Sequence, residues 1–395
     1  MSKKSPQLRF EGFTDDWEER KLGEVVKRVT RKNKELESTL PLTISAQEGL
    51  IDQNEFFNKT VASRDVSGYY LVKNGEFAYN KSYSNGYPWG AVKRLNRYDM
   101  GVLSTLYIVF KPIKINSDFL EKYYDTTYWY KEVSKHAAEG ARNHGLLNIA
   151  AYDFFETKIV IPSKIEEQQK IGALFKQLDK TIALHQRKLD LLKEQKKGYL
   201  QKMFPKNGAK VPELRFAGFA DDWEERKLSD VANHRGGTAI EKYFDKDGEY
   251  KVISIGSYGL NSQYVDQNIR AISNEITDGR VVNSGELTMV LNDKTANGTI
   301  IGRTLLVEKD NEYVINQRTE IISPKENFDS NFAYTILNGP FREKVKRIVQ
   351  GGTQIYVNYP AVSNLNLELP KIEEQQKIGS FFKQLDDTIA LHQRE

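Results

Sequence analysis

The sequence predicts an α+β protein with two globular mixed α/β domains in tandem repeat, separated by long helices that pair with each other. Three observations predict this architecture. The chain has 395 residues, which is more than one hydrophobic core usually serves. Two blocks of sequence occur twice, about 207 positions apart. An apolar heptad pattern runs through the second block of each copy.

Composition narrows the class of protein. Cysteine is absent, which excludes disulfides, thiolate zinc sites and cysteine nucleophiles and fits a reducing compartment. The opening residues MSKKSPQLRF lack the apolar core of a signal peptide, and the longest apolar-looking run, Val102–Phe110, is too short to span a bilayer. We therefore expect a soluble cytoplasmic protein without a membrane partner. The net charge of +4 does not by itself indicate a nucleic-acid partner.

The first repeated block opens each copy. It reads PQLRFEGFTDDWEERKLGEVV at Pro6–Val26 and PELRFAGFADDWEERKLSDVA at Pro212–Ala232, identical at 15 of 21 positions. We expect Trp17 and Trp223 to anchor the start of each domain to its core. The alternative is that this acidic block forms part of a docking face for a partner protein.

The segments between the repeated blocks share little sequence. Runs such as GYYLVKNGEFAYN and VNSGELTMVL are β-rich and end in Gly and Asn turns. Helical patterns follow at Asp118–Glu139 and Asn331–Val349. Two domains with one plan and different side chains suggest a shared task and two separate specificities.

The first domain contains a basic loop with interleaved aromatics and amides. Between Lys73 and Lys114 there are seven Lys or Arg against two acids. Such a loop can bind phosphates by charge and base edges by paired hydrogen bonds, and the alternative is a solvated hairpin. The candidate DNA contacts here, including two from the later KHAAEGARNHG segment, are Lys81, Tyr83, Asn85, Tyr87, Trp89, Lys93, Arg94, Arg97, Arg142 and Asn143.

The second domain has three comparable segments at matching places. They are NDKTANGTIIGR (292–303), INQRTE (315–320) and FREKVKRIVQGGTQ (341–354). Their side chains differ from those of the first domain, as expected for two different readers of sequence. The candidate contacts are Asn292, Lys294, Thr295, Asn297, Arg303, Gln317, Arg318, Arg347, Gln350, Thr353 and Gln354.

The second repeated block begins a long helix in each copy. Lys164–Lys188 and Lys371–Glu395 are identical at 21 of 25 positions, and both carry apolar residues at 4-3-4-3 spacing. We expect the two seams to pair, and the alternative is two helices that each lie on their own domain. The predicted pairing residues are Ile171, Phe175, Leu178, Ile182, His185, Ile378, Phe382, Leu385, Ile389 and His392. The predicted divisions are domain one 1–163, helix one 164–205, domain two 206–370 and helix two 371–395.

No catalytic or metal-binding signature is present in the sequence. There is no phosphate-binding loop, HExxH, GxSxG or GxGxxG motif. His185 and His392 occupy equivalent seam positions, where a polar residue that sets helix register is expected. A nuclease built on Asp245, Glu249 and Lys251 is an alternative, but such triplets arise by chance in a charged chain. We expect neither catalytic nor metal-ligating residues.

Taken together, the two repeats resemble the specificity subunit of type I restriction–modification systems. The resemblance covers nearly the whole chain and depends most on the repeated IEEQQKIGxxFKQLDxTIALHQR and on the Trp-Glu…Lys-Leu opening. The chain departs from the family pattern in its second helix, which lacks a counterpart of Leu189–Phe204. We expect the remaining seam of about 25 residues to hold the helices together.

The resemblance implies a function for each part. The domains would be target-recognition domains, related by a pseudo-two-fold axis through antiparallel helices. Each would read half of a bipartite target in double-stranded DNA, and helix length would set the gap. The partners would be two methyltransferase subunits that use S-adenosylmethionine and two restriction subunits that use ATP and Mg²⁺, while this chain would be non-catalytic and without a cofactor. A competing interpretation is a coiled-coil scaffold that binds proteins without recognising DNA.

Overall fold

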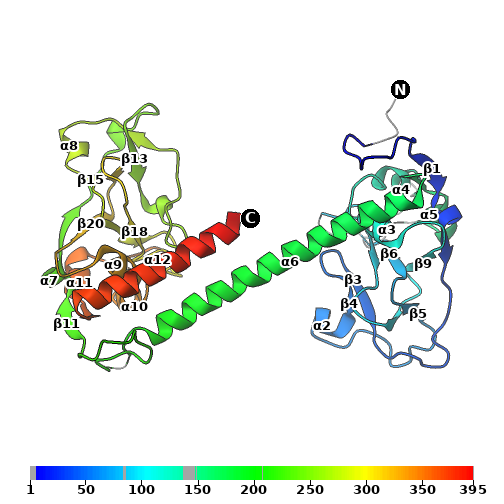
Figure 1. Ribbon diagram of the computed structural model, residues 1–395, viewed down its shortest axis with the longest axis horizontal. Helices are drawn as coiled ribbons and strands as arrows, with labels where there is room; N and C mark the ends of the chain where they lie inside the picture. The colour runs from blue at the N-terminus through cyan, green and yellow to red at the C-terminus, as the bar shows by residue number, and fades with distance from the viewer. Residues whose placement is uncertain (1–5, 83–85, 137–146, 148, 207, 395) are drawn as a thin grey trace. The chain divides into compact units, whose positions relative to one another are not determined.

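The computed structural model describes residues 6–82, 86–136, 147, 149–206 and 208–394. The chain divides into two compact units, residues 1–183 and 184–395, and each contains one copy of the repeated plan. Helix α6 (Ile165–Lys202) begins in the first unit and ends in the second (Figure 1). None of the helices in the described ranges has the length and apolar character needed to cross a membrane.

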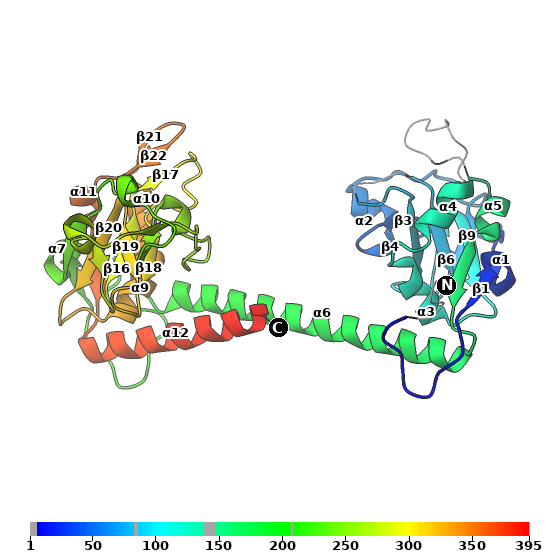
Figure 2. The same ribbon diagram turned by 90° about the horizontal axis from the view of Figure 1, so that it is seen from above.

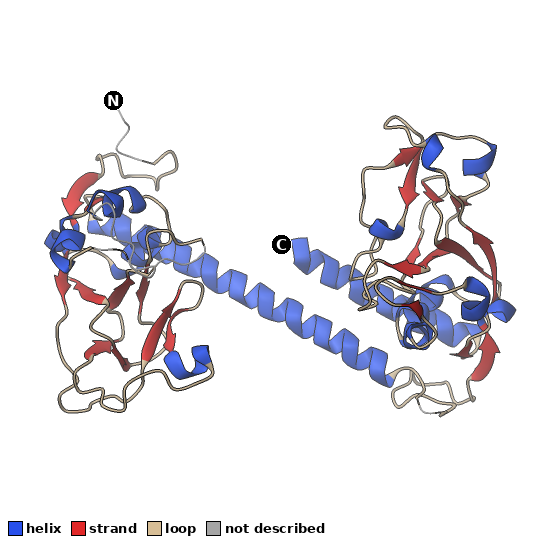
Figure 3. Cartoon of the chain, turned by 180° about the vertical axis from the view of Figure 1, so that it is seen from behind, coloured by secondary structure: helices blue, strands red, loops and turns tan. Residues whose placement is uncertain are grey.

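The first unit consists of short strands and brief helices (Figure 3). Before α6, its elements in chain order are β1 (Glu18–Lys21), α1 (Leu22–Val25), β2 (Val26–Arg28), β3 (Leu42–Ser45), β4 (Gly49–Asp52), α2 (Gln53–Phe57), β5 (Tyr70–Lys73), β6 (Phe77–Asn80), β7 (Ala91–Arg94), β8 (Met100–Leu103), β9 (Ile108–Pro112), α3 (Ser117–Tyr124), α4 (Tyr130–His136), α5 (Ala151–Glu156) and β10 (Lys158–Ile161). They form a four-stranded sheet in the order β2-β9-β6-β7 and the pairs β1-β10, β3-β4 and β5-β8.

Strand β6 separates two cores in this unit. Successive side chains of a strand point to opposite faces. Phe77 and Tyr79 therefore lie in an aromatic core, where Phe77 stacks on Phe110 at 5.4 Å and Tyr79 stacks on Phe154 at 4.5 Å. Ala78 faces a second apolar cluster on the other side. The aromatic core is the one that supports the start of α6, because Ile171 packs against it.

The second unit contains more short elements. After α6 they are β11 (Glu224–Lys227), α7 (Leu228–Val231), β12 (Ala232–Gly236), η1 (Glu241–Tyr243), β13 (Tyr250–Ile253), η2 (Ile255–Ser257), β14 (Arg270–Ala271), α8 (Glu275–Asp278), β15 (Val281–Val282), β16 (Leu287–Val290), β17 (Asn292–Asp293), β18 (Thr304–Leu306), β19 (Tyr313–Ile315), β20 (Thr319–Pro324), α9 (Ser330–Asn338), α10 (Pro340–Lys346), β21 (Gln350–Gly351), β22 (Ile355–Tyr356), α11 (Tyr359–Ser363), β23 (Asn366–Leu369) and α12 (Ile372–Arg394).

The two units share their main sheet although their middle sequences differ. The order β12-β20-β16-β18 in the second unit corresponds to β2-β9-β6-β7 in the first. In β16, Leu287 and Met289 face the core that also holds Phe332 and Phe382, while Val290 faces another cluster, as in β6. The alternation of apolar residues, rather than their identity, thus preserves this sheet.

The first repeated block forms an edge strand that closes each module. Strand β1 pairs antiparallel with β10, with Glu18 opposite Ile161, and β11 pairs in the same way with β23, with Glu224 opposite Leu369. The tryptophan before each strand lies against the core of its own unit, as predicted, because Trp223 is buried and Trp17 packs against the aromatic core.

The repeated octapeptide IEEQQKIG joins the long helix to its module through a buried ion pair. In the first unit the Glu167 carboxylate accepts hydrogen bonds from Arg9 Nε and Nη2 at 2.6 and 2.8 Å. In the second, Glu374 accepts from Arg215 Nε and Nη2 at 2.7 and 2.8 Å. Both glutamate side chains are only 1% exposed. The octapeptide therefore has a docking role as well as beginning the helix.

The neighbouring glutamine and glycine complete this joint. Gln168 donates to the carbonyl of Pro162 at 2.9 Å and accepts from the Asn116 N–H at 2.9 Å. Gln375 makes the equivalent bonds to Pro370 at 2.8 Å and from Asp329 at 3.0 Å. A Cβ atom on Gly172 would lie 2.8 Å from a backbone nitrogen of α3, and one on Gly379 would lie 2.6 Å from a backbone nitrogen of α9, so glycine is required for this close approach.

This close approach gives a prediction for stability. We expect Gly379→Ala to lower the free energy of unfolding by about 1–3 kcal/mol, because α12 must move away from α9 to admit a methyl group. Gly198 in α6 is the matched control, since a methyl group added there would have no other atom within 4 Å, and Gly198→Ala should stabilise by up to about 1 kcal/mol. Urea denaturation of both variants checks this, and equal effects would contradict it.

The last turns of α6 pack antiparallel against α12 within the second unit (Figure 1). Tyr199 lies edge-on to Phe381 with ring centroids 5.0 Å apart. Further along, the rings of His185 and His392 are 6.3 Å apart. As the residue number rises along one helix it falls along the other, which defines the antiparallel direction.

The ten residues of the predicted seam have different environments. Ile171 packs on the core of the first unit, and Ile378 and Phe382 lie in the core of the second. Ile389 is buried and Leu385 half-buried, whereas three residues of α6 are exposed, namely Phe175, Leu178 and Ile182. Each helix therefore begins on its own module, and contact between the helices is made by their later turns.

Candidate nucleic-acid interface

Three loops of the second unit meet beside a small sheet. Strands β17, β22 and β21 form a three-stranded sheet in which Tyr356 lies opposite both Asn292 and Gln350. Figure 2 shows this sheet at the end of the unit that is remote from α12. The sheet brings together the loop after β17, the turn between β19 and β20, and the β21–β22 hairpin.

The loop after β17 is held by one buried carboxylate. Asp293 is 3% exposed and accepts hydrogen bonds from the backbone N–H groups of Thr295 at 2.9 Å and Ile300 at 2.8 Å. Burial opposes ionisation of this carboxyl, but the bonds from Ile300 and Thr295 outweigh it and lower the Asp293 pKa. The loop is thus ordered around a buried charge, and Lys294, Thr295 and Asn297 project from it as exposed residues.

The turn between β19 and β20 has a strained backbone and is held by several side-chain hydrogen bonds. Arg318 has a φ of 66°, a left-handed conformation that is uncommon for a residue with a side chain and is found mainly where the surroundings impose it. The buried Asn316 accepts from the Gln317 N–H at 2.8 Å and donates to Glu241 at 3.0 Å, and Gln317 also donates to Glu241 at 3.0 Å. These bonds fix the backbone that carries Arg318.

A groove of about 380 Å³ lies between these loops. With its amide oriented to satisfy both neighbours, Asn292 accepts a hydrogen bond from Arg318 at 3.0 Å. Five predicted contact residues line the groove, which are Asn292, Lys294, Gln317, Arg318 and Gln354. Most of the side chains that line it are polar, and it opens to solvent, as expected for a surface that meets an extended ligand.

Some lining residues were not predicted from the sequence. Glu241, Ser254 and Gly256 complete the groove, and an adjoining hollow of about 1070 Å³ adds Tyr356 and Asn358. Tyr356 is 40% exposed although it belongs to a strand. In the sequence, Tyr356 lies between apolar Ile355 and Val357, and this alternation is the signal that could have revealed an outward-facing aromatic.

Other predicted contacts of the second unit lie apart from the groove. Arg303 donates to the Thr299 carbonyl at 2.9 Å and to Ser262 at 2.8 Å, and it lines a separate hollow together with residues of α6 and α12. Burial lowers the pKa of this guanidinium. Gln350 and Thr353 are exposed in the hairpin, and Arg347 is exposed at the end of α10.

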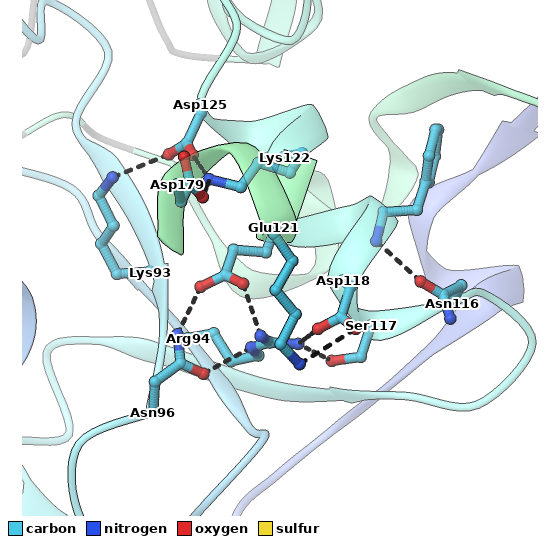
Figure 4. Close-up of polar contacts among 12 residues, drawn as sticks. Lys93, Arg94, Asn96, Asn116, Ser117, Asp118, Glu121, Lys122, Asp125 and Asp179 are labelled. Atoms are coloured by element: carbon cyan, nitrogen blue, oxygen red, sulfur yellow. Dashed lines mark hydrogen bonds and ion pairs between the residues drawn. The ribbon is translucent and has the colours of Figure 1, made fainter. Parts of the chain in front are cut away.

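In the first unit, two predicted contacts have structural partners (Figure 4). Arg94 is paired with Asp118 at 2.7 Å and Glu121 at 2.6 Å, and its side chain is 10% exposed. Lys93 pairs with Asp125 at 3.0 Å. These contacts tie β7 to α3 and the residue that follows it, so we leave both basic residues out of the proposed DNA interface.

The remaining candidates of the first unit are spread around the β6–β7 hairpin. The Tyr87 hydroxyl donates to the Ala46 carbonyl at 3.2 Å, and Trp89 packs against the aromatic core. Lys81 donates to the Ile149 carbonyl at 3.5 Å, and Arg97 is exposed. Four further candidates lie outside the described residues, namely Tyr83, Asn85, Arg142 and Asn143.

The three residues of the nuclease alternative have separate partners. Lys251 pairs with Glu312 at 2.9 Å. Glu249 accepts a hydrogen bond from the Ser273 N–H at 2.9 Å, and Asp245 accepts one from the Asp247 N–H at 2.9 Å. Each side chain stabilises its own turn or strand pairing.

Comparison with known proteins places both modules in one family. The family described as "Type I restriction modification DNA specificity domain" matches residues 14–194 and 220–395. The type I restriction enzyme MjaVIII specificity subunit of Methanocaldococcus jannaschii is 25% identical over 265 residues, 64% of this chain and 60% of that protein. The HindI specificity subunit of Haemophilus influenzae is 27% identical over 177 residues, 43% of this chain and 37% of that protein. The chain thus spans less than two thirds of the length of these relatives.

Solved structures show the same fold. The S subunit of a type I restriction–modification system from M. genitalium matches with a TM-score of 0.59 and 12% identity, over 100% of this chain and 94% of that chain. A structure concerned with assembly and conformational transition of the type I R-M system matches with a TM-score of 0.51 and 17% identity, over 98% and 94% of the two chains. Because the family match covers most of its length in two copies, the chain belongs to the type I restriction–modification DNA specificity family.

Proposed function

We propose that this chain is the non-catalytic DNA-recognition subunit of a type I restriction–modification enzyme, in which each module reads one half of a bipartite target. The observation that carries the proposal is the groove of the second unit, where polar side chains from three loops converge beside a small three-stranded sheet. The first unit shares the four-stranded main sheet of the second but carries unlike loops between its strands. Two domains that recognise different half-sites are expected to share a fold and to differ in their loops.

The side chains at the groove suit direct reading of bases. Arginine can pair with the O6 and N7 acceptors of guanine, and asparagine or glutamine with the N6 and N7 groups of adenine. Arg318, Gln317 and Gln354 supply those groups. Lys294 suits a phosphate contact, because a lysine ammonium is a compact charge without planar geometry.

The chemistry of the enzyme would belong to partner subunits. We propose two methyltransferase subunits, which use S-adenosylmethionine, and two restriction subunits, which use ATP and Mg²⁺, acting with this chain in the cytoplasm. The relatives are named as specificity subunits of restriction enzymes, which supports the division of labour.

The competing function is a coiled-coil scaffold that binds proteins without recognising DNA. Gel-shift assays of the chain with its cognate methyltransferase separate the two. We expect binding to a specific duplex that weakens steeply as salt rises, because phosphate contacts release counterions. Binding that ignores both sequence and salt, or no binding, would favour the scaffold.

Arg318 provides a residue-level prediction. We expect Arg318→Ala to weaken binding to the cognate duplex by about 1–3 kcal/mol and to relax selectivity at one position of one half-site. Backbone strain is unchanged, since alanine also carries a Cβ. The matched control is Arg226→Ala, whose arginine is 52% exposed and pairs with Glu224 in β11. Quantitative gel shifts with single-base variants measure both. Loss of selectivity spread over both half-sites would contradict the assignment.

A further inference from the structure

The loop after β17 is held by two buried side chains of opposite charge. The Asp293 carboxylate accepts hydrogen bonds from N–H groups of the loop, as described above. In addition, Arg342 of α10 is 7% exposed, and its guanidinium donates to three carbonyls of the loop. Nε bonds the Ile301 carbonyl at 2.9 Å, and Nη2 bonds those of Gly298 and Thr299 at 2.9 and 2.8 Å. Both donors and acceptors of this backbone are therefore engaged by buried charges.

Arg342 is a buried cation whose partners are neutral. Lys344, in the same helix, pairs with Glu368 at 2.9 Å, whereas the Arg342 guanidinium has no ion-pair partner among the residues that the structure describes. Burial disfavours its charged form and, with the nearby Arg303, lowers the Arg342 pKa to about 10. A buried charge bonded only to carbonyls costs more free energy than an apolar side chain of similar size would. The stability of the fold alone therefore does not account for an arginine at this position.

The loop packs directly against α10. Ile301 is 0% exposed and belongs to the core of the second unit. Gly302 has a φ of 69°, and a Cβ atom added there would lie 2.9 Å from Cγ1 of Val345 in α10. Glycine permits both that backbone conformation and that close approach. The second half of the loop, 298–302, is thus fixed to α10, while residues 294–297 are exposed.

The exposed start of the loop carries three of the predicted DNA contacts, which are Lys294, Thr295 and Asn297. Lys294 lines the groove together with Gln317 and Arg318. A flexible loop that orders only when it meets its ligand loses conformational entropy on binding, and this loss lowers affinity. A loop that is already ordered avoids the loss, which gives the buried Arg342 a function.

We propose that Arg342 is a positioning residue for DNA recognition, which holds the loop after β17 in its binding conformation before DNA is present. This inference rests on the proposed function, because it takes the groove as the surface that reads DNA. Arg342 acts through the backbone of the loop and does not itself contact DNA, since its side chain is buried and bonded to three carbonyls. The contacts are made by the exposed residues 294–297.

The test measures, by fluorescence anisotropy, how labelled duplexes bind the full chain assembled with its cognate methyltransferase. The duplexes carry the target identified by methylation mapping and single-base variants of each half-site. Arg342→Met keeps a long side chain and removes every donor. We expect affinity for the cognate duplex to fall at least about tenfold, because the loop must then order on binding. Discrimination against base changes should be reduced in one half-site and kept in the other, since only one module contains this loop.

Salt dependence distinguishes positioning from direct contact. Each phosphate contact contributes about 0.9 to the slope of log affinity against log salt concentration. Arg342→Met should leave this slope unchanged, whereas Lys294→Ala should reduce it by about that amount. Arg342→Lys should retain part of the affinity, because an ammonium group can still donate to the loop carbonyls but lacks the planar guanidinium.

Gly379→Ala is the matched control for stability. It disturbs the contact between α12 and α9 in the same unit, and α12 is remote from the groove (Figure 2). At a temperature where the variant is folded, it should leave both affinity and discrimination unchanged. Equal losses of affinity in Arg342→Met and Gly379→Ala would overturn the proposal, because Arg342 would then serve only the stability of the unit.

Two further results would overturn it. Unaltered cognate affinity of Arg342→Met would mean that the loop needs no such support, and a salt slope reduced by about 0.9 would make Arg342 a phosphate contact. Where Arg342→Met does not fold, Arg342→Lys decides, with a loss of about threefold or more expected and unaltered affinity contradicting the proposal. Failure of the proposed function looks different, because the unaltered assembly would then bind all duplexes alike, which overturns both.

Discussion

Inserting four helix-forming residues after Ile182 is expected to abolish methylation of the original target and to create a target with a gap about two base pairs wider. Four residues lengthen an α-helix by about 6 Å, and each base pair of DNA occupies about 3.4 Å. Ile182 suits the insertion because it and its neighbours are exposed, whereas Leu189 is buried. The prediction depends on the proposed function of α6 as the spacer between two readers.

Mapping methylated adenines in cells that carry the insertion and the cognate methyltransferase measures the gap. The control carries four alanine substitutions at exposed positions of α6 with no change in length, and it should keep the original target. An unchanged gap in the insertion variant would show that α6 does not set the distance between the half-sites.

Removing Arg215 is expected to cause the largest loss of stability in the second unit. Arg215→Ala leaves the Glu374 carboxylate, 1% exposed, without its partner. An uncompensated buried charge costs about 3–5 kcal/mol, so the variant should unfold at much lower urea concentration. The loss should also loosen the start of α12, because Glu374 joins the helix to the repeated LRF segment.

Arg226→Ala is again the matched control, since its ion pair with Glu224 is solvent-exposed. Such pairs contribute little, so its effect should stay within about 0.5 kcal/mol. Urea denaturation followed by tryptophan fluorescence compares the two variants, because Trp223 lies in the same core. A loss no larger than that of Arg226→Ala would mean that the buried pair does not hold the helix to the module.

Much of the architecture follows from patterns that are local in the sequence. The duplication, the heptads and the β-rich middles predicted two tandem α+β modules with long helices, and the family match and solved structures confirm that fold. The docking role of the octapeptide was not predictable in the same way. Glu167 and Arg9 are 158 positions apart, and nothing in either segment alone indicates their pairing.

The candidate site could be predicted only in part, because contacts between residues distant in the sequence again decide the outcome. Polar loops with Asn, Gln, Lys and Arg mark exposed surface, and in the second unit they converge on one groove. Arg94 lies in a sequence segment of similar composition. Its side chain, however, forms ion pairs with Asp118 and Glu121, which are more than 20 positions away in the sequence. A basic residue that binds an acid of its own domain cannot be told by sequence from one that meets DNA.

The seam shows a third limit of sequence patterns. Heptad spacing correctly marks one apolar face on each helix, but it does not identify what covers that face. Phe382 is covered by its own module and by the end of α6, whereas Phe175, at the equivalent position, is 44% exposed. The difference depends on residues outside the repeat.

The most direct measurement is the sequence of the sites methylated when this chain is expressed with its cognate methyltransferase in a host without other adenine methylation. Our account predicts one motif with two short specified parts and an unspecified gap of constant length between them. It also predicts that Arg318→Ala alters only one of those parts. A single uninterrupted motif, or a variant that changes both parts together, would contradict the claim that two different modules read the two halves of the target.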